Sequence, residues 1–311
     1  MRERVYLVGF LVGAAVLLYV GRHLLEQSAL VTWGLTFAGT TAVGVLGITL
    51  YRVQLELRAS RHELARKEAE LNFAYEVQQA LFPRQFPAGA GLEFAGACIP
   101  ARGISGDYYD VLEFPGGRTV FTFADISGKG ISAAILMSNL HAVTRMLAAA
   151  GGSPAEVCSR LNRHFHQVTE GLRFATLFYA EWDQAEHCLR HINAGHMAPV
   201  LLASSPSRRL AASAPPLGIF PETRFQEERT CLEPGDLLVL FSDGVTEAAN
   251  SRGIEFGESR LEAVVAGCRT QPLARILEQV VKAVRAWAGE ELNDDMTLLL
   301  VRARRAGEEG V

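Results

Sequence analysis

The sequence lacks both an excess of basic residues and any close pair of cysteines. Its 311 residues carry a net charge of −4, so no basic stripe is available to bind nucleic acid. The five cysteines are scattered singly, which argues against a zinc site and against a disulfide framework. They are Cys98, Cys158, Cys188, Cys231 and Cys268. We interpret them as buried thiols of a reducing compartment.

Three common catalytic motifs are also missing. Gly128-Lys129-Gly130 is not a P-loop, because no Ser or Thr follows the lysine and no glycine stands five residues upstream. Ile104-Ser105-Gly106 is not a nucleophile elbow, because the G-x-S-x-G pattern is absent. No Cys-x5-Arg loop occurs either. These absences leave nucleotide binding and covalent hydrolysis without support.

Two long uncharged runs stand near the N-terminus. Val5–Val20 has about sixteen residues without a charge, and Ala29–Tyr51 has more than twenty. A membrane-spanning helix needs roughly 20 apolar residues, so the second run is long enough and the first is marginal. A signal peptide is the alternative for the first run. No Ala-x-Ala-like cleavage site follows it, however, and a second apolar run comes at once. The pattern therefore predicts a transmembrane hairpin.

Basic residues flank the two predicted spans on one side of the membrane. Arg2 and Arg4 precede the first span, whereas Arg52, Arg58 and Arg61 follow the second. By the positive-inside tendency, both ends of the hairpin face the cytoplasm. We therefore expect a multi-pass protein of the inner (plasma) membrane, with the larger part of the chain in the cytoplasm.

The segment after the second run changes to a charged, helix-favouring composition. Leu57, Leu64 and Leu71 recur every seven residues, which is the spacing of one apolar position in a coiled-coil heptad. The other apolar position of the heptad is weak. Pro83 and Pro87 end the helix. Two interpretations stay open: a solvated helix that continues the second span, or a short parallel coiled coil that forms a homodimer.

Beyond residue 87 the pattern changes to short apolar runs mixed with a few longer helical ones. Strands are predicted at Leu92–Ile99, Asp107–Phe114, Thr119–Ala124, Arg173–Asp183, Cys188–Asn193, Pro199–Ala203, Asp236–Phe241 and Met296–Arg302. Helices are predicted at Ile131–Ala150, Pro154–Glu170, Ser259–Gly267 and Pro272–Gly289. Strands joined by hairpins and followed by paired helices favour an α+β layered sandwich over an alternating parallel sheet. The Ser204–Arg209 stretch is interpreted as a loop.

Four aspartates end or begin apolar, strand-like runs: Asp107, Asp125, Asp243 and Asp294. A carboxylate next to a buried run is costly to desolvate unless a positive group meets it. Almost no Lys or Arg stands in the same motifs, and carboxylates are preferred ligands of Mg²⁺ and Mn²⁺. The pattern therefore predicts a divalent-cation site. Each aspartate taken alone could instead be a helix cap or a turn residue.

The four aspartates are expected to form two pairs. Asp107 and Asp125 bracket a predicted hairpin through Pro115-Gly116-Gly117. Adjacent antiparallel strands can bring such residues to one edge of a sheet. The runs next to Asp243 and Asp294 could lie beside each other in the same way.

Seven strings occur in order along the chain: SGDYYDV, FADISGKGISAAILM, FATLFYAEWD, INAGHMAPVLL, LEPGDLLVLFSDGVTEAAN, GIEFG and DDMTLLLV. This ordered set resembles the successive motifs of the bacterial SpoIIE/RsbU-type branch of the PPM (metal-dependent) Ser/Thr protein phosphatases. The resemblance runs from about residue 75 to residue 303. It implies a four-layer αββα sandwich, preceded here by the two spans and the helical linker. Ser105 departs from the branch, which usually has glycine at that position.

The resemblance also implies a role for each acidic residue around two Mn²⁺ or Mg²⁺ ions. Asp125 is implied to bridge both ions, and the Ile126 carbonyl is implied to be a further ligand. Asp107 is implied to bind through metal-bound waters. Asp243 and Asp294 are implied to hold the second ion.

Other polar residues have weaker claims to a role. Asp295 is less favoured as a ligand, and Arg102 is interpreted as a surface charge, not as a phosphate-binding arginine. For His196 a structural hydrogen bond is favoured over a general-acid role. Three residues near the metal motifs can shape the loop or contact the substrate: Asp110, Ser127 and Lys129.

The expected function follows from two-metal chemistry. Two cations about 3.5–4 Å apart lower the pKa of a bridging water to near neutrality and align it with phosphorus. We expect a membrane-tethered, cytoplasmic phosphatase that acts on phosphoserine or phosphothreonine. The resemblance implies a STAS-type anti-sigma-factor antagonist as the substrate. It also relates the helix that ends near residue 82 to the switch helix that couples input to these phosphatases.

The expected domain order is a transmembrane hairpin over residues 1–51, a linker (switch) helix over 52–86, the phosphatase domain over 87–305 and a tail over 306–311. Two other functions stay open. The phosphatase-like domain could only bind a partner, as part of a membrane-bound signalling scaffold, and metal titration separates that case. The domain could also hydrolyse small phosphoesters, which nothing in the sequence excludes.

Overall fold

The computed structural model describes residues 2–24, 29–87, 91–101, 103–203, 207–289 and 292–304. The chain divides into two compact units, Met1–Glu70 and Leu71–Val311. The predicted tail over residues 306–311 lies outside the described residues. The first unit contains the helix α1 (Arg2–Leu24) and most of the helix α2 (Ala29–Gln79).

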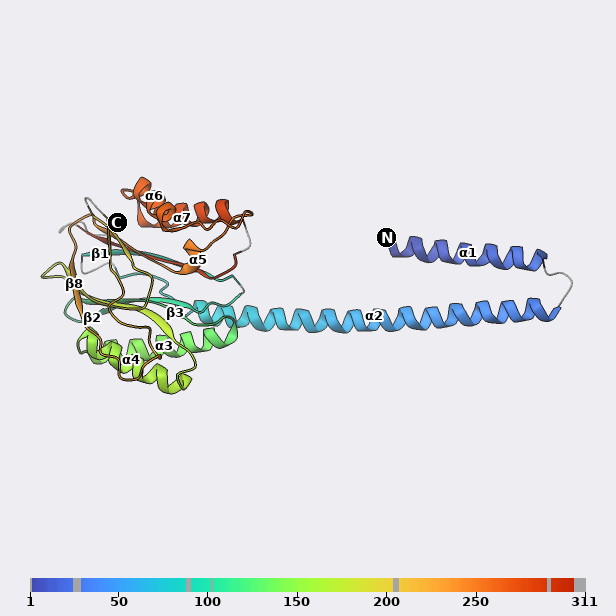
Figure 1. Ribbon diagram of the computed structural model, residues 1–311, viewed down its shortest axis with the longest axis horizontal. Coiled ribbons are helices and arrows are strands. Elements are labelled where there is room, and N and C mark those ends of the chain that lie inside the picture. Colours follow the sequence, from blue (N-terminus) through green and yellow to red (C-terminus); the bar gives the residue numbers. More distant parts are fainter. Residues whose placement is uncertain are drawn as a thin grey trace. The chain divides into compact units, whose positions relative to one another are not determined.

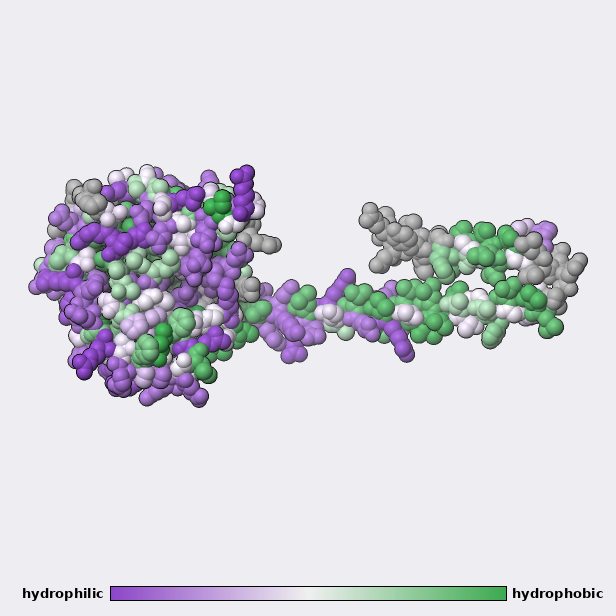
Figure 2. All heavy atoms as spheres, viewed as in Figure 1, coloured by the Kyte–Doolittle hydropathy of each residue, from purple (hydrophilic) through white to green (hydrophobic). Residues whose placement is uncertain are grey.

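The part of α1 from residue 10 onward and the first half of α2 are mostly apolar on the face that Figure 2 presents. Leu17, Leu30 and Trp33 are each at least 77% exposed, although water disfavours such large apolar side chains. Within α2, the helix Leu30–Gln79 contains a window long and apolar enough to cross a membrane. The apolar stretch of α1 in the described residues, Phe10–His23, is shorter. Length and composition therefore support one candidate span in this unit and leave α1 marginal.

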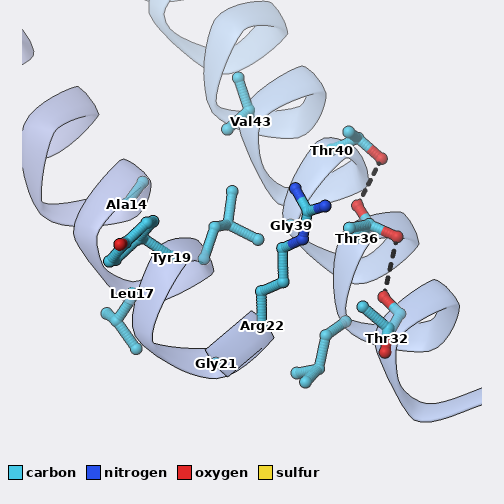
Figure 3. Close-up of a pocket in the computed structure, with 12 residues that line it drawn as sticks. Ala14, Leu17, Tyr19, Gly21, Arg22, Thr32, Thr36, Gly39, Thr40 and Val43 are labelled. Atoms are coloured by element: carbon cyan, nitrogen blue, oxygen red, sulfur yellow. Dashed lines mark hydrogen bonds between the residues drawn. The ribbon is translucent and has the colours of Figure 1, made fainter. Parts of the chain in front are cut away.

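A groove of about 640 Å³ lies between α1 and α2. Figure 3 shows the Arg22 side chain extending across it toward Gly39 on α2. The threonines of α2 satisfy their hydroxyls within the helix: Thr36 Oγ1 donates to the Thr32 carbonyl at 3.0 Å, and Thr40 Oγ1 donates to the Thr36 carbonyl at 2.9 Å. Such back-bonding lets polar side chains occupy an apolar helix without unpaired hydroxyls.

In the described part of the second unit, two five-stranded antiparallel sheets form the centre. The first has the strand order β1-β10-β9-β6-β7, and the second has the order β2-β3-β4-β5-β8. The strands of the first sheet are β1 (Leu92–Ile99), β6 (Val200–Leu202), β7 (Arg208–Arg209), β9 (Leu237–Phe241) and β10 (Met296–Ala303). Those of the second are β2 (Asp107–Phe114), β3 (Arg118–Ile126), β4 (Ala175–Asp183), β5 (Cys188–Ala194) and β8 (Glu228–Cys231).

Two helices cover the outer face of each sheet (Figure 1). The helices α3 (Ile131–Ala150) and α4 (Pro154–Thr169) pack on the second sheet, and α7 (Leu273–Ala288) packs on the first beside α6 (Glu258–Cys268). One apolar core fills the space between the sheets and under α3 and α4, and a second lies under α6 and α7. This four-layer arrangement confirms the predicted α+β sandwich.

The helix α3 is itself long and apolar enough to pass the composition test for a membrane span. Its inward face, which includes Met137 and Leu140, is completely buried against the second sheet. We therefore assign α3 to the protein core, where an amphipathic helix of this length belongs.

Most predicted strands and helices match the observed ones to within two residues, and three short elements were not predicted. The strand β7 lies inside the stretch interpreted as a loop, so that interpretation is wrong at residues 208–209, while residues 204–206 lie outside the described residues. The strand β8 and the one-turn helix α5 (Asp243–Thr246) were missed as well.

One interpretation of the cysteines is also wrong. Cys188 on β5 stands directly opposite Cys231 on β8, and the two form a disulfide. Cys158 and Cys268 are buried free thiols, as predicted, and Cys98 is partly buried. The pairing could not be read from the sequence, because 43 positions separate Cys188 from Cys231.

Candidate functional site

The β2–β3 hairpin places two of the four predicted aspartates opposite each other. Asp107 begins β2 and is the direct cross-strand partner of Asp125 near the end of β3. The hairpin prediction is therefore confirmed. Ser105, the departure from the family pattern, accepts a hydrogen bond from the Asp107 amide at 2.9 Å through its hydroxyl. The serine thus helps to fix the start of β2.

The β9–β10 pair brings the other two aspartates to neighbouring strand ends. Asp243 follows β9 as the first residue of α5, and Asp294 stands two residues before β10. The two strands are antiparallel neighbours. A Cβ at Gly244 would lie 2.1 Å from the Asp295 carbonyl oxygen. Only glycine therefore fits at this position, where α5 meets the segment before β10.

Asp295 links the two sheets at this edge of the sandwich. Its Oδ1 accepts from the Ala101 amide and its Oδ2 accepts from the Gly106 amide, both at 2.9 Å. Asp295 precedes β10 in the first sheet, whereas Gly106 immediately precedes β2 in the second. The carboxylate therefore holds the segments that carry Asp107 and Asp294 together.

The side chain of a lysine also links the two sheets through an ion pair. Lys129 follows β3, and its Nζ lies 2.6 Å from Asp294 Oδ2 in an ion pair. Both side chains are partly exposed, so the pair contributes only about 0–1 kcal/mol to stability. Its consequence is positional, because it brings the loop after Asp125 next to Asp294.

Burial and mutual repulsion act on the acids gathered at this edge. Burial, followed by the charges of Asp243 and Asp294, raises the pKa of Asp125 to about 7. Burial and the charge of Asp125 raise the pKa of Asp107 well above its usual range, and burial and Asp294 raise the pKa of Asp243. Carboxylates that raise one another's pKa in this way call for a positive group among them.

The chemistry of these residues fits a hard divalent cation. All the charged donors are carboxylate oxygens, and Asp107 Oδ2 is buried without a hydrogen-bond partner among the described residues. As the side chains stand, no three His, Cys, Asp or Glu residues within the described ranges are grouped tightly enough to hold an ion. Two of the acids here have other partners: Asp294 pairs with Lys129, and Asp295 accepts from backbone amides. The fit of these residues to a divalent cation thus rests on their carboxylate oxygens, their negative charge and their burial.

Two backbone features place the Ile126 carbonyl beside this edge. The Ile126 amide donates to the Gly106 carbonyl at 3.4 Å. A Cβ at Gly106 would lie 3.2 Å from the Ile126 oxygen and 3.4 Å from the Ala133 Cβ. The glycine therefore leaves room around the Ile126 carbonyl that a larger residue would fill.

A further residue next to this edge was not predicted from the sequence. Gln78, at the end of α2, donates from Nε2 to the Ser105 carbonyl at 2.7 Å and accepts from the Ser105 amide through Oε1 at 2.8 Å. The side chain is only 3% exposed. Gln78 thereby fixes the residue that precedes Gly106 and Asp107.

Two other residues considered from the sequence have structural partners. Asp110 is fully buried and accepts two hydrogen bonds from Arg145 on α3, at 2.6 and 3.0 Å. His196 Nδ1 lies 2.9 Å from the Thr176 hydroxyl, and burial lowers the pKa of His196 to about 4. Its imidazole is therefore neutral at physiological pH. Arg102 lies outside the described residues.

A family profile described as "Stage II sporulation protein E (SpoIIE)" matches residues 115–304. The chain belongs to the SpoIIE family. Among curated relatives, phosphoserine phosphatase RsbU of Bacillus subtilis (strain 168) is 28% identical over 256 residues, which cover 82% of this chain and 75% of RsbU. This SpoIIE-family chain is thus a Ser/Thr protein phosphatase, as its motifs predict.

Two solved structures share the fold of this SpoIIE-family chain. The SiaA-PP2C domain of Pseudomonas aeruginosa has a TM-score of 0.68 at 20% identity, with 77% of this chain and 98% of that domain covered. RsbX, solved in complex with magnesium, has a TM-score of 0.51 at 14% identity, with 68% of this chain and 94% of RsbX covered. At these identities the two structures support the fold alone.

Proposed function

We propose that this SpoIIE-family chain is a membrane-tethered, metal-dependent phosphatase that hydrolyses phosphoserine or phosphothreonine in a protein. One observation carries the proposal: carboxylates from two sheets meet at one edge, where they raise one another's pKa. Divalent cations relieve such repulsion. The PP2C-family fold and the RsbU likeness supply the reaction class.

The residues at this edge have two proposed roles, to hold the metal ions and to position the segments that carry the ligands. Asp125 and the Ile126 carbonyl would hold Mn²⁺ or Mg²⁺ at the end of β3, and Asp107 would contribute to the same site through solvent. Asp243 and Asp294 would hold the second ion. When bound, two such ions activate a water as the nucleophile and offset charge on the phosphoryl oxygens. Asp295 and Gln78 do not contact the substrate in this proposal, and they position the segments that carry the ligands.

The RsbU likeness supports the substrate class that we propose. RsbU is described as a phosphoserine phosphatase, and a phosphorylated STAS-type anti-sigma-factor antagonist is the substrate we propose here. The exposed edge of the sandwich, where Lys129 is about half exposed, leaves room for a protein. A small phosphoester is the competing substrate, and a comparison of kcat/KM on the two substrate types distinguishes them.

The N-terminal part is proposed to anchor the enzyme at the plasma membrane. The support is the mostly apolar surface of α1 from residue 10 onward and of the first half of α2 (Figure 2), together with the basic residues that follow them. We retain the proposed order of a hairpin over residues 1–51, a linker helix over 52–86 and a catalytic domain over 87–305. Leu57 and Leu64 are more than half exposed, as expected for a helix that pairs with a second copy.

The full-length chain in detergent tests the proposal. With Mn²⁺ present, it should hydrolyse both an aryl phosphate and a phosphothreonine peptide, and excess EDTA should abolish both activities. Asp125→Asn should lower kcat/KM by at least 100-fold at an unchanged melting temperature, because the neutral amide is a weak ligand for a hard cation. Equal turnover with and without EDTA would contradict the proposal that hydrolysis depends on a metal ion. A chain that neither binds Mn²⁺ in a calorimetric titration nor hydrolyses either substrate would favour the signalling scaffold.

A further inference from the structure

Arg173 lies beside the loop that follows Asp125. Its Nη1 donates to the Ser127 carbonyl at 3.1 Å. A Cβ at Gly128 would lie only 2.1 Å from the same nitrogen. The guanidinium thus occupies the space that a side chain at residue 128 would need. Gly128 also has a φ of 105°, which L-residues rarely adopt.

The backbone of Arg173 is anchored on both sides. Phe174 exchanges two hydrogen bonds with Ser127: the Ser127 amide donates to the Phe174 carbonyl at 2.9 Å, and the Phe174 amide donates to the Ser127 hydroxyl at 3.0 Å. The Arg173 carbonyl accepts from the Thr169 hydroxyl at 3.2 Å. Since the peptide around Arg173 is fixed to the loop after Asp125, its side chain starts from a defined position.

The charge of Arg173 has no acidic partner among the described residues. Lys129, the cation on the loop after Asp125, is paired with Asp294. The side chain of Arg173 is exposed, and the Ser127 carbonyl takes one of its five N–H donors. A guanidinium with free donors matches a phosphate group, which accepts two parallel N–H bonds.

The approach to Arg173 is open enough for a protein. Leu172 is 82% exposed and Phe174 is 42% exposed. These apolar side chains flank Arg173 in sequence, and Arg173 is itself exposed. A phosphorylated residue on a protein surface could therefore reach Arg173 and the acidic edge together.

We propose that Arg173 is a phosphate-binding residue, which holds the phosphoryl group of the substrate beside the carboxylates at the end of β3. The inference rests on the proposed phosphatase activity. It adds to that activity a positive contact for substrate that neither Lys129 nor Asp294 supplies, because these two neutralise each other.

A purely structural role for Arg173 is the competing explanation. In that case the bond to the Ser127 carbonyl would only stiffen the loop after Asp125. Loss of the bond would then lower kcat or thermal stability and leave the affinity for inorganic phosphate unchanged. Phosphate affinity is therefore the measurement that separates the two roles.

The experiment compares Arg173→Ala, Arg173→Lys and Arg163→Ala in the full-length chain in detergent with Mn²⁺. Arg163 is an exposed arginine on α4 and controls for the loss of one positive charge. Arg173→Ala should raise KM for an aryl phosphate and for a phosphothreonine peptide. It should also raise the inhibition constant of inorganic phosphate. Both KM values and the inhibition constant should rise by about ten-fold or more. Arg173→Lys should recover part of the lost phosphate affinity, since lysine keeps the positive charge but lacks the two parallel N–H donors of the guanidinium.

The outcomes for Arg173 and for the phosphatase proposal are distinguishable. An inhibition constant for phosphate within two-fold of wild type in Arg173→Ala would overturn the phosphate-binding role, whatever happens to kcat. A wild-type chain that hydrolyses neither substrate would overturn the phosphatase proposal instead. Calorimetry with inorganic phosphate would then still test Arg173, because binding needs no turnover.

Discussion

At the scale of single residues, a carboxylate can accept hydrogen bonds through one of its oxygens or through both, and the difference decides whether an amide can replace it. Asp295 uses both oxygens, one for the Ala101 amide and one for the Gly106 amide. Asp183, the last residue of β4, uses the single oxygen Oδ1 for the amides of Ala185 and Glu186. An asparagine can replace the second kind of carboxylate but not the first, because only one of its terminal atoms accepts.

Asp295→Asn should therefore loosen the link between the two sheets, whereas Asp183→Asn should not. The new amide group would face a backbone N–H, and the unpaired donor costs about 1–3 kcal/mol. Thermal unfolding of the full-length chain should show a lower midpoint for Asp295→Asn by roughly 2–4 °C per kcal/mol lost. Equal midpoints for the two variants would contradict the proposed link.

The four aspartates of the site could be predicted from the sequence, but the hydrogen bonds that hold their segments in place could not. Asp107, Asp125, Asp243 and Asp294 stand next to apolar runs, a pattern visible in one dimension. Asp295 bonds to backbone amides 189 and 194 positions away. Backbone partners have no residue signature, so such a contact appears only once the chain is folded.

At the scale of elements, strands that cross the core were predicted well and edge strands were not. The strands β9 and β10 are apolar and buried on both faces, so their sequences differ clearly from the loops around them. The strands β7 and β8 have two and four residues, and most of those side chains are exposed. The disulfide between Cys188 and Cys231 depends on β8 and was missed with it.

The end of α2 offers a test of how one element controls another. Gln78→Glu keeps the shape of the side chain but cannot donate to the Ser105 carbonyl, and it places a charge at a position only 3% exposed. The variant should need more Mn²⁺ for half-maximal activity and should lose roughly ten-fold in kcat/KM. Metal-dependent activity assays provide the measurement.

Glu76→Gln is the matched control for Gln78→Glu. It makes the reverse exchange on the same helix, at an exposed position, and should behave as wild type. If both variants retain wild-type metal dependence, the contact between α2 and the Ser105 segment has no influence on the acidic edge.

At the scale of the whole molecule, two kinds of surface divide the chain. Figure 2 shows mostly apolar side chains over α1 from residue 10 onward and over the first half of α2, and a mixture of polar and apolar side chains over the catalytic unit. A catalytic unit that carries two cores of its own does not need the apolar helices for folding. Those helices are then free to serve as an anchor.

The proposed topology predicts that both ends of the hairpin lie in the cytoplasm. A periplasmic alkaline phosphatase reporter fused after residue 26 should be active, because that position follows only the first span. The same reporter fused after residue 58 should be inactive. Two inactive fusions, or two active ones, would rule out a hairpin with this orientation.

The number of Mn²⁺ ions bound per chain tests the central claim most directly. Calorimetric titration of the full-length protein should give two ions for wild type and for Asp183→Asn, and fewer for Asp125→Asn and Asp243→Asn. No bound ion at a Mn²⁺ concentration that saturates hydrolysis, or equal binding by all four proteins, would contradict it.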